Sequence, residues 1–239
     1  MEGPQIVTAE QLASLDANGF YITDVLFDEE QLRAVRDELL GLAESQPSNK
    51  SGGTFAYSLH LKSEACRQFL RHPVFASLCT QLLGPTIYQT WNQMIVKMPG
   101  TGGNFAWHQD GYYGAYQPDG TPTGDSSAMS AAETLTFWVA LNDSTVENGC
   151  LWALPGKHNR GLLPHRWNEA GQEWIGTYAT DEEIPVELKA GQVLVFTRLT
   201  PHRSGANVTD GPRIGYQIGY AIEPGHYDRV LFLADGELV

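Results

Sequence analysis

The stretch TLTFWVALND, residues 134–143, decides the fold class. Its apolar side chains Leu135, Phe137, Val139 and Leu141 recur at every second position. Alternate residues of a β-strand point to the same face of a sheet. The segment is therefore predicted to be a strand that packs this face against a core.

Similar short segments lie on both sides of this stretch. Strands are predicted within residues 86–98, 149–156, 191–199 and 213–222, and Gly, Pro, Asn and Asp residues separate them. Short strands with turn signals between them favour a sandwich or a barrel. A β-core over about 84–222 is therefore expected.

Helical patterns dominate the chain before the strands. Thr8 followed by Gln11 has the pattern of a capping box and predicts the start of a helix that ends at Gly19. Helices are also predicted within residues 27–45 and 63–84, the second interrupted near Pro73.

We expect a single domain over residues 1–239, mainly β with flanking N-terminal helices. The helical part covers about 1–83, and the segment 45–54 has the composition of a loop. A chain of 239 residues with 42% hydrophobic residues can form one substantial core.

Charge and composition narrow the possible partners. The formal net charge is −13 and no cluster of Lys and Arg offsets it, so neither nucleic acid nor an anionic membrane surface is an expected partner. No apolar run approaches the roughly 18 residues of a membrane helix, and no secretory signal is evident, so a cytoplasmic protein is expected. The three cysteines match no disulfide framework.

The segment WHQDGYYGAY, residues 107–116, contains the first candidate site. If it is a strand, His108 and Asp110 point the same way and can reach one ion. Two histidines and one carboxylate form the facial triad of non-haem Fe(II) oxygenases. The pair alone is weak evidence, because such tripeptides also occur on ordinary surfaces.

A second segment supplies the missing ligand. His202 follows a predicted strand in GQVLVFTRLTPHRSGAN, and Ser204 lies two residues further on. Arg213 follows nine residues after that serine. Arginine binds carboxylates through two donors, so Arg213 with Ser204 suits the remote carboxylate of a dicarboxylic co-substrate such as 2-oxoglutarate.

With these residues in place, the sequence resembles the phytanoyl-CoA dioxygenase family of Fe(II)/2-oxoglutarate-dependent oxygenases, which includes ectoine hydroxylase. The matching motifs are WHQDG, WVALNDSTVENGCLWALPGKH and PHRSGANVTDGPRIGYQIGY, and the resemblance covers residues 8–222. It implies a double-stranded β-helix, a jelly roll related to the cupins.

The resemblance also implies roles for individual residues. His108, Asp110 and His202 would be the catalytic iron ligands, and Ser204 and Arg213 would bind 2-oxoglutarate, with O2 as the second co-substrate. Gln93 and Lys97 fall where the family contacts the co-substrate. Related halogenases have a small residue at the carboxylate position, so the presence of Asp110 favours hydroxylation over halogenation.

Aromatic residues surround the proposed metal segment. Trp107, Tyr112, Tyr113 and Trp138 are candidate substrate contacts, since aromatic walls commonly line small-molecule pockets. Core packing would equally explain each of them. The segment 114–131 is long enough to form a lid, although a plain surface connection would have the same length.

The expected reaction is hydroxylation of an unactivated C–H bond in a small metabolite or a natural-product intermediate, with release of succinate and CO2. Desaturation, cyclisation, epimerisation or endoperoxide formation on the same cofactors stays open. Two further classes stay open as well: a cupin-type metalloenzyme that works without 2-oxoglutarate, and a non-catalytic jelly roll that binds a ligand. The sequence leaves the substrate and the oligomeric state open.

Overall fold

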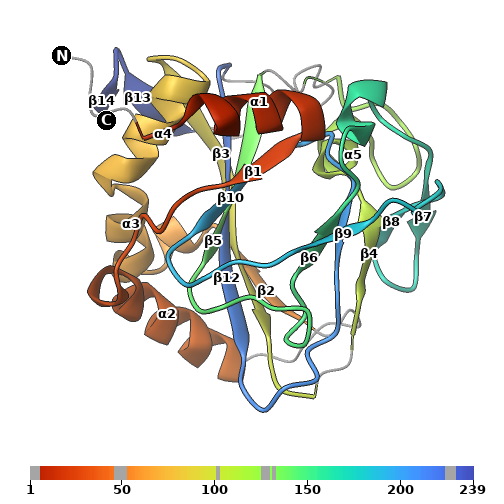
Figure 1. Cartoon of the computed structure of the whole chain (residues 1–239), viewed down its shortest axis with the longest axis horizontal. Helices are drawn as coiled ribbons and strands as arrows, with labels where there is room; N and C mark the ends of the chain where they lie inside the picture. The colour runs from red at the N-terminus through yellow and green to blue at the C-terminus, as the bar shows by residue number, and fades with distance from the viewer. Residues whose placement is uncertain (1–5, 46–52, 101–102, 125–129, 131–132, 224–229) are drawn as a thin grey trace.

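The computed structural model describes residues 6–45, 53–100, 103–124, 130, 133–223 and 230–239. Two antiparallel sheets face each other within it (Figure 1). The larger sheet runs in the order β1-β10-β5-β12-β3-β13-β14, and β2 also pairs with β3. Its strands are β1 (Phe20–Ile22), β2 (Thr54–Tyr57), β3 (Ile87–Lys97), β5 (Thr134–Ala140), β10 (Val193–Thr197), β12 (Arg213–Ala221), β13 (Val230–Ala234) and β14 (Glu237–Leu238).

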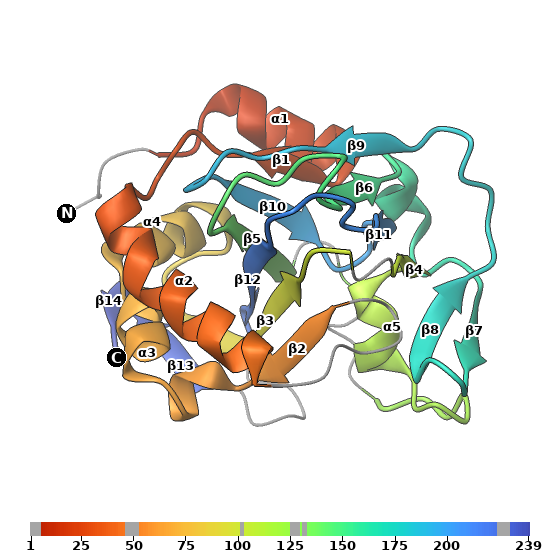
Figure 2. The ribbon, with the colours of Figure 1, turned by 90° about the horizontal axis from the view of Figure 1, so that it is seen from below.

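The smaller sheet runs in the order β4-β11-β6-β9. Its strands are β4 (Phe105–His108), β6 (Leu151–Ala153), β9 (Ile184–Val186) and β11 (His202–Ser204). A separate hairpin of β7 (His165–Asn168) and β8 (Glu173–Gly176) lies beside β4 and the short helix α5 (Asp110–Ala115) (Figure 2).

Four helices cover the outer face of the larger sheet and one of its ends (Figures 1 and 2). They are α1 (Ala9–Asn18), α2 (Glu29–Glu44), α3 (Glu64–Leu70) and α4 (Pro73–Leu82). The predicted capping box is confirmed, because Thr8 and Gln11 bond each other's backbone N–H. The predicted interruption near Pro73 is confirmed as well, since that proline opens α4.

The predicted strand at 134–143 becomes β5, in which all seven residues are buried. One face of β5, with Leu135, Phe137 and Val139, joins the core beneath the helices. The other face, with Trp138 and Ala140, packs between the two sheets. The predicted packing of the Leu135, Phe137 and Val139 face against a core is therefore confirmed, and the strand is buried on its second face as well.

The fold is a double-stranded β-helix, or jelly roll, as expected from the sequence. The long strands β3, β5, β10 and β12 were predicted from their patterns, whereas β1 and β2, within the N-terminal part expected to be helical, were not. Most of the expected loop at 45–54 lies outside the described residues. None of the helices that the structure describes is long and apolar enough to cross a membrane.

Strand order determines where the site forms. β12 lies between β5 and β3, so Gln217 has Trp138 on one side and Gln93 on the other. Arg213 begins the same strand. These side chains therefore face the smaller sheet along one line, opposite His202 of β11.

Candidate active site

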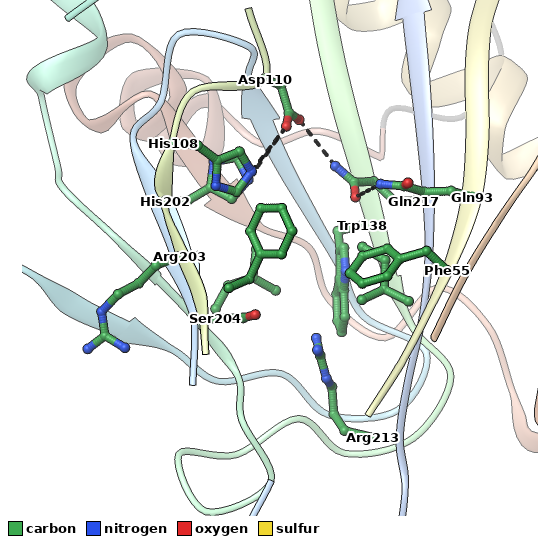
Figure 3. A pocket seen from close by; sticks show the side chains of 13 residues that line it. Phe55, Gln93, His108, Asp110, Trp138, His202, Arg203, Ser204, Arg213 and Gln217 are labelled. Atoms are coloured by element: carbon green, nitrogen blue, oxygen red, sulfur yellow. Dashed lines mark hydrogen bonds and ion pairs between the residues drawn. The ribbon is translucent and has the colours of Figure 1, made fainter. Parts of the chain in front are cut away.

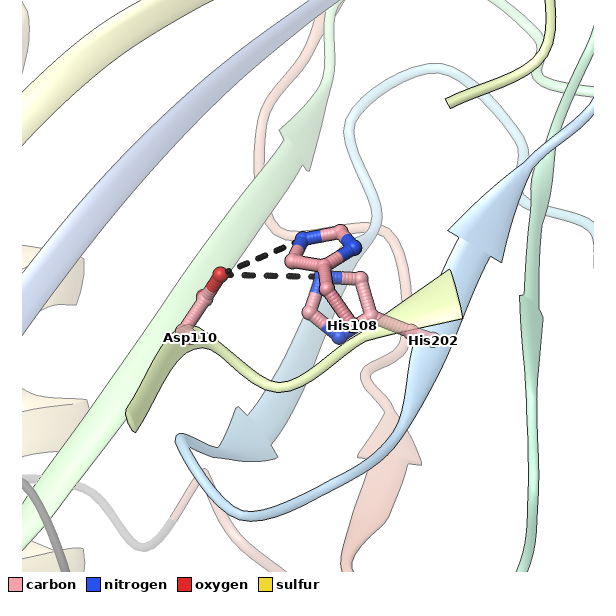
Figure 4. A group of neighbouring side chains, drawn as sticks. All are labelled: His108, Asp110 and His202. Carbon is pink, nitrogen blue, oxygen red and sulfur yellow. Dashed lines mark ion pairs between the residues drawn. The ribbon is translucent and has the colours of Figure 1, made fainter. Parts of the chain in front are cut away.

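The two segments singled out in the sequence meet on the smaller sheet. β4 and β11 are antiparallel neighbours, and His108 is the direct partner of His202. Asp110 does not continue the strand, as a simple alternating pattern would have it, but opens α5. The chain bends after His108, and the bend still brings the carboxylate toward both imidazoles (Figure 4).

His108, Asp110 and His202 offer one ligand atom each, and the three atoms lie within 4.8 Å of one another. Oδ1 of Asp110 is 3.5 Å from Nε2 of His108 and 3.7 Å from Nε2 of His202. All three residues are buried. Such a cluster of buried N and O donors is suited to a divalent transition metal.

Backbone contacts set the orientation of both imidazoles. Nδ1 of His108 lies 2.9 Å from the carbonyl of Ala106, and Nδ1 of His202 lies 3.0 Å from that of Thr200. A carbonyl can only accept, so Nδ1 carries the proton and donates it. Nε2 of each ring is then left with a lone pair that points toward Asp110, which is the tautomer that a metal ligand requires.

The electrostatics of the cluster favour a cation. Burial alone would raise the pKa of Asp110, but His202, His108 and Arg198 together lower it to about 2. Burial, followed by the proximity of His108, lowers the pKa of His202 to about 4. At neutral pH, Asp110 is therefore an anion and His202 is neutral, so both can bind a metal without first losing a proton.

The outer oxygen of Asp110 has its own donors. Oδ2 accepts hydrogen bonds from Thr136 at 3.2 Å and from Nε2 of Gln217 at 3.1 Å. Gln93 in turn donates to Oε1 of Gln217 at 2.8 Å. Thr136 and Gln217 were not predicted as site residues from the sequence. The only feature that sets them apart there is a polar side chain within an otherwise apolar buried strand.

Arg213 occupies the other end of the site. Its side chain is 1% exposed, and its guanidinium carbon lies 5.2 Å from the ring centroid of Trp138. Its Nε and Nη2 atoms have no hydrogen-bond partner among the described residues. Burial lowers the pKa of Arg213 to about 10, so it remains charged at neutral pH. A buried cation with unused donors calls for an anionic partner.

A cavity of about 50 Å³ connects the histidine–aspartate cluster to Arg213 (Figure 3). Ser204 lies between the two ends, on the same face of β11 as His202. The remaining lining residues are Phe55, Gln93, Ile95, Phe105, Trp138, Leu151, Arg203 and Gln217. The cavity thus has a histidine–aspartate end, a cationic end at Arg213 and a largely apolar wall.

Not every residue nominated from the sequence lies on the cavity. Lys97 is buried, and its ammonium donates to the carbonyls of Gly103, at 2.9 Å, and Gly205. It is the direct partner of Arg213 on the neighbouring strand β3 and is not among the lining residues. Trp107 points to the opposite face of β4 from His108, where its ring stacks 5.6 Å from the guanidinium of Arg203.

The tyrosines nominated as substrate contacts lie on α5, next to the hairpin. Tyr112 packs against His165 at 4.0 Å and Trp174 at 4.8 Å between ring centroids. Tyr113 accepts a hydrogen bond from the backbone of Trp174, and its ring lies 5.9 Å from that of His108. Part of the nominated lid, residues 125–129 and 131–132, lies outside the described residues.

Comparison with known proteins gives the family. A family model described as phytanoyl-CoA dioxygenase (PhyH) matches residues 15–215. A zebrafish phytanoyl-CoA dioxygenase domain-containing protein 1 is 29% identical over 71% of this chain, and the match spans 57% of that relative. An ectoine dioxygenase of Nocardia farcinica is 28% identical over 87% of this chain and 75% of its own length.

Solved structures share the fold. The epimerase SnoN, in complex with Fe3+, alpha ketoglutarate and nogalamycin RO, matches with a TM-score of 0.73 at 24% identity, over 91% of this chain and 84% of SnoN. EvdO2 from Micromonospora carbonacea, complexed with 2-oxoglutarate, matches with a TM-score of 0.74 at 21% identity, over 92% and 93% of the two chains. With the family model covering residues 15–215, the chain belongs to the phytanoyl-CoA dioxygenase (PhyH) family.

Proposed function

We propose that this protein is an Fe(II)- and 2-oxoglutarate-dependent dioxygenase that hydroxylates an unactivated C–H bond of a small metabolite or natural-product intermediate. One observation carries the proposal. A buried His108–Asp110–His202 cluster is joined by a cavity to Arg213, a buried cation with unused donors. The family membership and the 2-oxoglutarate held by the similarly folded EvdO2 support it.

His108, Asp110 and His202 would hold the iron. The donor set fits, because both imidazoles are oriented by backbone carbonyls and the carboxylate faces their Nε2 atoms. A set of three protein ligands would leave room at the ion for a co-substrate. When bound, iron and 2-oxoglutarate would supply the oxidising chemistry, with O2 consumed and succinate and CO2 released.

Arg213 and Ser204 would bind the remote carboxylate of 2-oxoglutarate. Both line the cavity: Arg213 at the end away from the metal ligands, and Ser204 between that end and the histidines. Within the part of the chain that the structure describes, Nε and Nη2 of the guanidinium have no hydrogen-bond partner, which suits a bidentate contact with a carboxylate. Trp138 packs against the guanidinium and limits the directions in which it can turn.

The chain's own residues then orient the reactants and keep water out. Thr136 and Gln217 hold Asp110 by its outer oxygen, which leaves Oδ1 toward the histidines. Phe55, Ile95 and Phe105 supply an apolar wall. Such a wall places a C–H bond in a dry site next to the metal ligands.

The charge of the protein bears on the substrate class. The net charge is −13, and Arg203, the other cation that lines the cavity, is paired with Glu183 at 2.8 Å. An acyl-CoA carries phosphates that need free basic side chains. A small substrate without such phosphates fits these charges better.

The test uses protein purified without oxygen and loaded with Fe(II). We expect one equivalent of iron, binding of 2-oxoglutarate, and oxygen consumption that forms succinate only when 2-oxoglutarate is present. His108→Ala and His202→Ala should abolish succinate formation and leave the fold intact. His158→Ala is the matched control, because His158 is a buried histidine that contacts the carbonyl of Asp16 outside the cavity.

A second outcome on the same cofactors is supported by the neighbours of the fold. SnoN is an epimerase, and SnoK, which matches with a TM-score of 0.72 at 21% identity, is a carbocyclase. The mass of the product separates the outcomes: one added oxygen indicates hydroxylation, a loss of two hydrogens indicates cyclisation or desaturation, and an unchanged mass indicates epimerisation. Oxygen uptake without 2-oxoglutarate would instead indicate a cupin-type metalloenzyme.

A further inference from the structure

Two glutamines connect the metal-ligand cluster to the wall of the cavity. Nε2 of Gln217 donates to Oδ2 of Asp110 at 3.1 Å, and Nε2 of Gln93 donates to Oε1 of Gln217 at 2.8 Å. The two glutamines are direct partners on neighbouring strands β12 and β3, and both line the cavity (Figure 3). They form a short relay of amides that begins at Asp110.

Asp110 sets the direction of this relay. A carboxylate that serves as a metal ligand can only accept hydrogen bonds. Gln217 must therefore turn its NH2 group toward Asp110, which leaves its carbonyl oxygen toward β3. Gln93 must then turn its own NH2 group toward Gln217. The orientation of both amides, which is interchangeable for an isolated glutamine, is fixed by a single anion.

The relay ends on an acceptor. Oε1 of Gln93 is buried and has no hydrogen-bond partner among the described residues. Buried acceptors are nearly always paired, so an unpaired one in the wall of a ligand cavity points to a partner supplied by the ligand. Because the oxygen can only accept, that partner has to be an O–H or N–H group.

We propose that Gln93, held by Gln217, accepts a hydrogen bond from the substrate, which therefore carries a hydroxyl, amine or amide N–H close to the carbon that is oxidised. The inference rests on the proposed function and narrows its substrate class. It also moves Gln93 from the co-substrate, its expected partner, to the substrate. The carboxylates of 2-oxoglutarate only accept hydrogen bonds, so an amide oxygen would repel them.

The other residues of the cavity wall indicate the chemical character of the rest of the substrate. Phe55 and Phe105 lie 5.8 Å apart between ring centroids and line the same cavity as Gln93. Ile95 adds a further apolar surface. Aromatic and aliphatic walls favour an apolar or aromatic body, and Gln93 adds one specific polar contact.

The test compares phenol with anisole as probes. Both carry a benzene ring and an oxygen, and only phenol has an O–H to donate. Ligand-observed NMR on Zn(II)-substituted protein, saturated with 2-oxoglutarate, gives the two dissociation constants without turnover. For the wild-type protein we expect phenol to bind about fivefold more tightly, the size of one net hydrogen bond. Equal binding of the two probes, or no binding of either, overturns the inference.

Two variants locate the effect. Gln93→Met keeps the volume and removes the acceptor, so it should abolish the preference for phenol and leave the affinity for 2-oxoglutarate unchanged. Gln217→Met keeps Gln93 but releases its amide, and it should weaken the preference in the same direction. A loss of 2-oxoglutarate affinity in Gln93→Met would assign Gln93 to the co-substrate and contradict the inference. If wild-type protein loaded with metal does not bind 2-oxoglutarate at all, the proposed function fails instead.

Discussion

Gly215 and Trp138 lie in contact on the neighbouring strands β12 and β5, with no room for a side chain between them. A Cβ atom added at Gly215 would come within 2.1 Å of Cζ2 of Trp138, far closer than any real contact. The same indole ring lies 5.2 Å from the guanidinium of Arg213. The glycine therefore makes the space for the ring that packs against Arg213 at the cationic end of the cavity.

Gly215→Ala is expected to weaken 2-oxoglutarate binding. The added methyl group has to displace the Trp138 ring, which is fully buried and packs against Arg213. Overpacking of this kind costs about 1–3 kcal/mol of stability, and we expect the affinity for 2-oxoglutarate to fall about tenfold as the ring moves. Calorimetric titration of the metal-loaded protein measures the affinity, and urea unfolding measures the stability.

Gly219→Ala is the matched control on the same strand. A Cβ at that position would also meet side chains, those of Thr90 and Trp91, but neither lines the cavity. It should lower stability and leave the affinity for 2-oxoglutarate unchanged. Equal losses of affinity in the two variants would show that the effect is a general loosening of β12.

Arg213→Met should separate binding from stability. The proposed contact of the guanidinium with 2-oxoglutarate would involve two charge-assisted hydrogen bonds, so their loss should lower the affinity about 100-fold or more. The protein without 2-oxoglutarate should become more stable, by on the order of 1 kcal/mol, because an apolar side chain replaces a buried charge whose Nε and Nη2 have no partner among the described residues. Urea unfolding with and without 2-oxoglutarate tests both effects.

Arg203→Met is the control for charge. Arg203 also borders the cavity, but it is paired with Glu183 and stacks on Trp152 at 4.5 Å. Its loss should destabilise the protein and leave the affinity for 2-oxoglutarate nearly unchanged. A destabilised Arg213→Met protein would mean that the guanidinium has a structural partner and is not reserved for a ligand.

The sequence was informative where a pattern repeats over many residues. Alternation over 134–143 and 213–222 predicted β5 and β12, and the capping box at Thr8 predicted the start of α1. Strands of three or four residues, such as β1 and β4, have too few positions for a period to appear. They form because the neighbouring strands β10 and β11 offer them backbone hydrogen-bond partners.

The candidate site also contains residues that a local sequence pattern predicts and residues that it does not. The spacing of His108 and Asp110 nominated a ligand pair, and the structure brings His202 to it from 92 residues away along the chain. Thr136 and Gln217 could not be nominated, because each is recognisable only through its contact with Asp110, a partner distant in sequence. Tertiary contacts, not local pattern, give such residues their function.

The buried amine of Lys97 is expected to make the stability of the protein depend on pH. Burial, and then the nearby charge of Arg213, lowers its pKa to about 7 from 10.5. Between these two values the unfolded chain binds a proton that the folded chain has lost, so this group makes stability rise with pH. Below about pH 7 both states are protonated, and the cost of the buried charge is fully present. One proton corresponds to a slope of about 1.4 kcal/mol per pH unit.

Lys97→Met should remove this slope between about pH 7 and 10.5 in urea unfolding experiments. Lys189→Met serves as the control, because Lys189 is an exposed lysine that pairs with Asp143. The affinity for 2-oxoglutarate separates a structural role from a binding role, since Lys97 donates to the carbonyls of Gly103 and Gly205 and does not line the cavity. If Lys97→Met lost as much affinity for 2-oxoglutarate as Arg213→Met, Lys97 would be assigned a role in binding the co-substrate.

The hydrogen-bond donors to Oδ2 of Asp110 are expected to contribute to metal affinity. Thr136→Val and Gln217→Met each remove one of the two side-chain hydrogen bonds that hold this oxygen. Residues that orient a metal ligand typically contribute about ten- to 100-fold to metal affinity, so each variant should bind Co(II) about tenfold more weakly, and the double variant more weakly still. Titration against a competing chelator measures this affinity. Thr134→Val is the control, because it removes a buried threonine hydroxyl on the same strand that donates to the carbonyl of Ser130 instead. If the control and Thr136→Val lose affinity equally, the carboxylate is positioned by the strand and not by these hydrogen bonds.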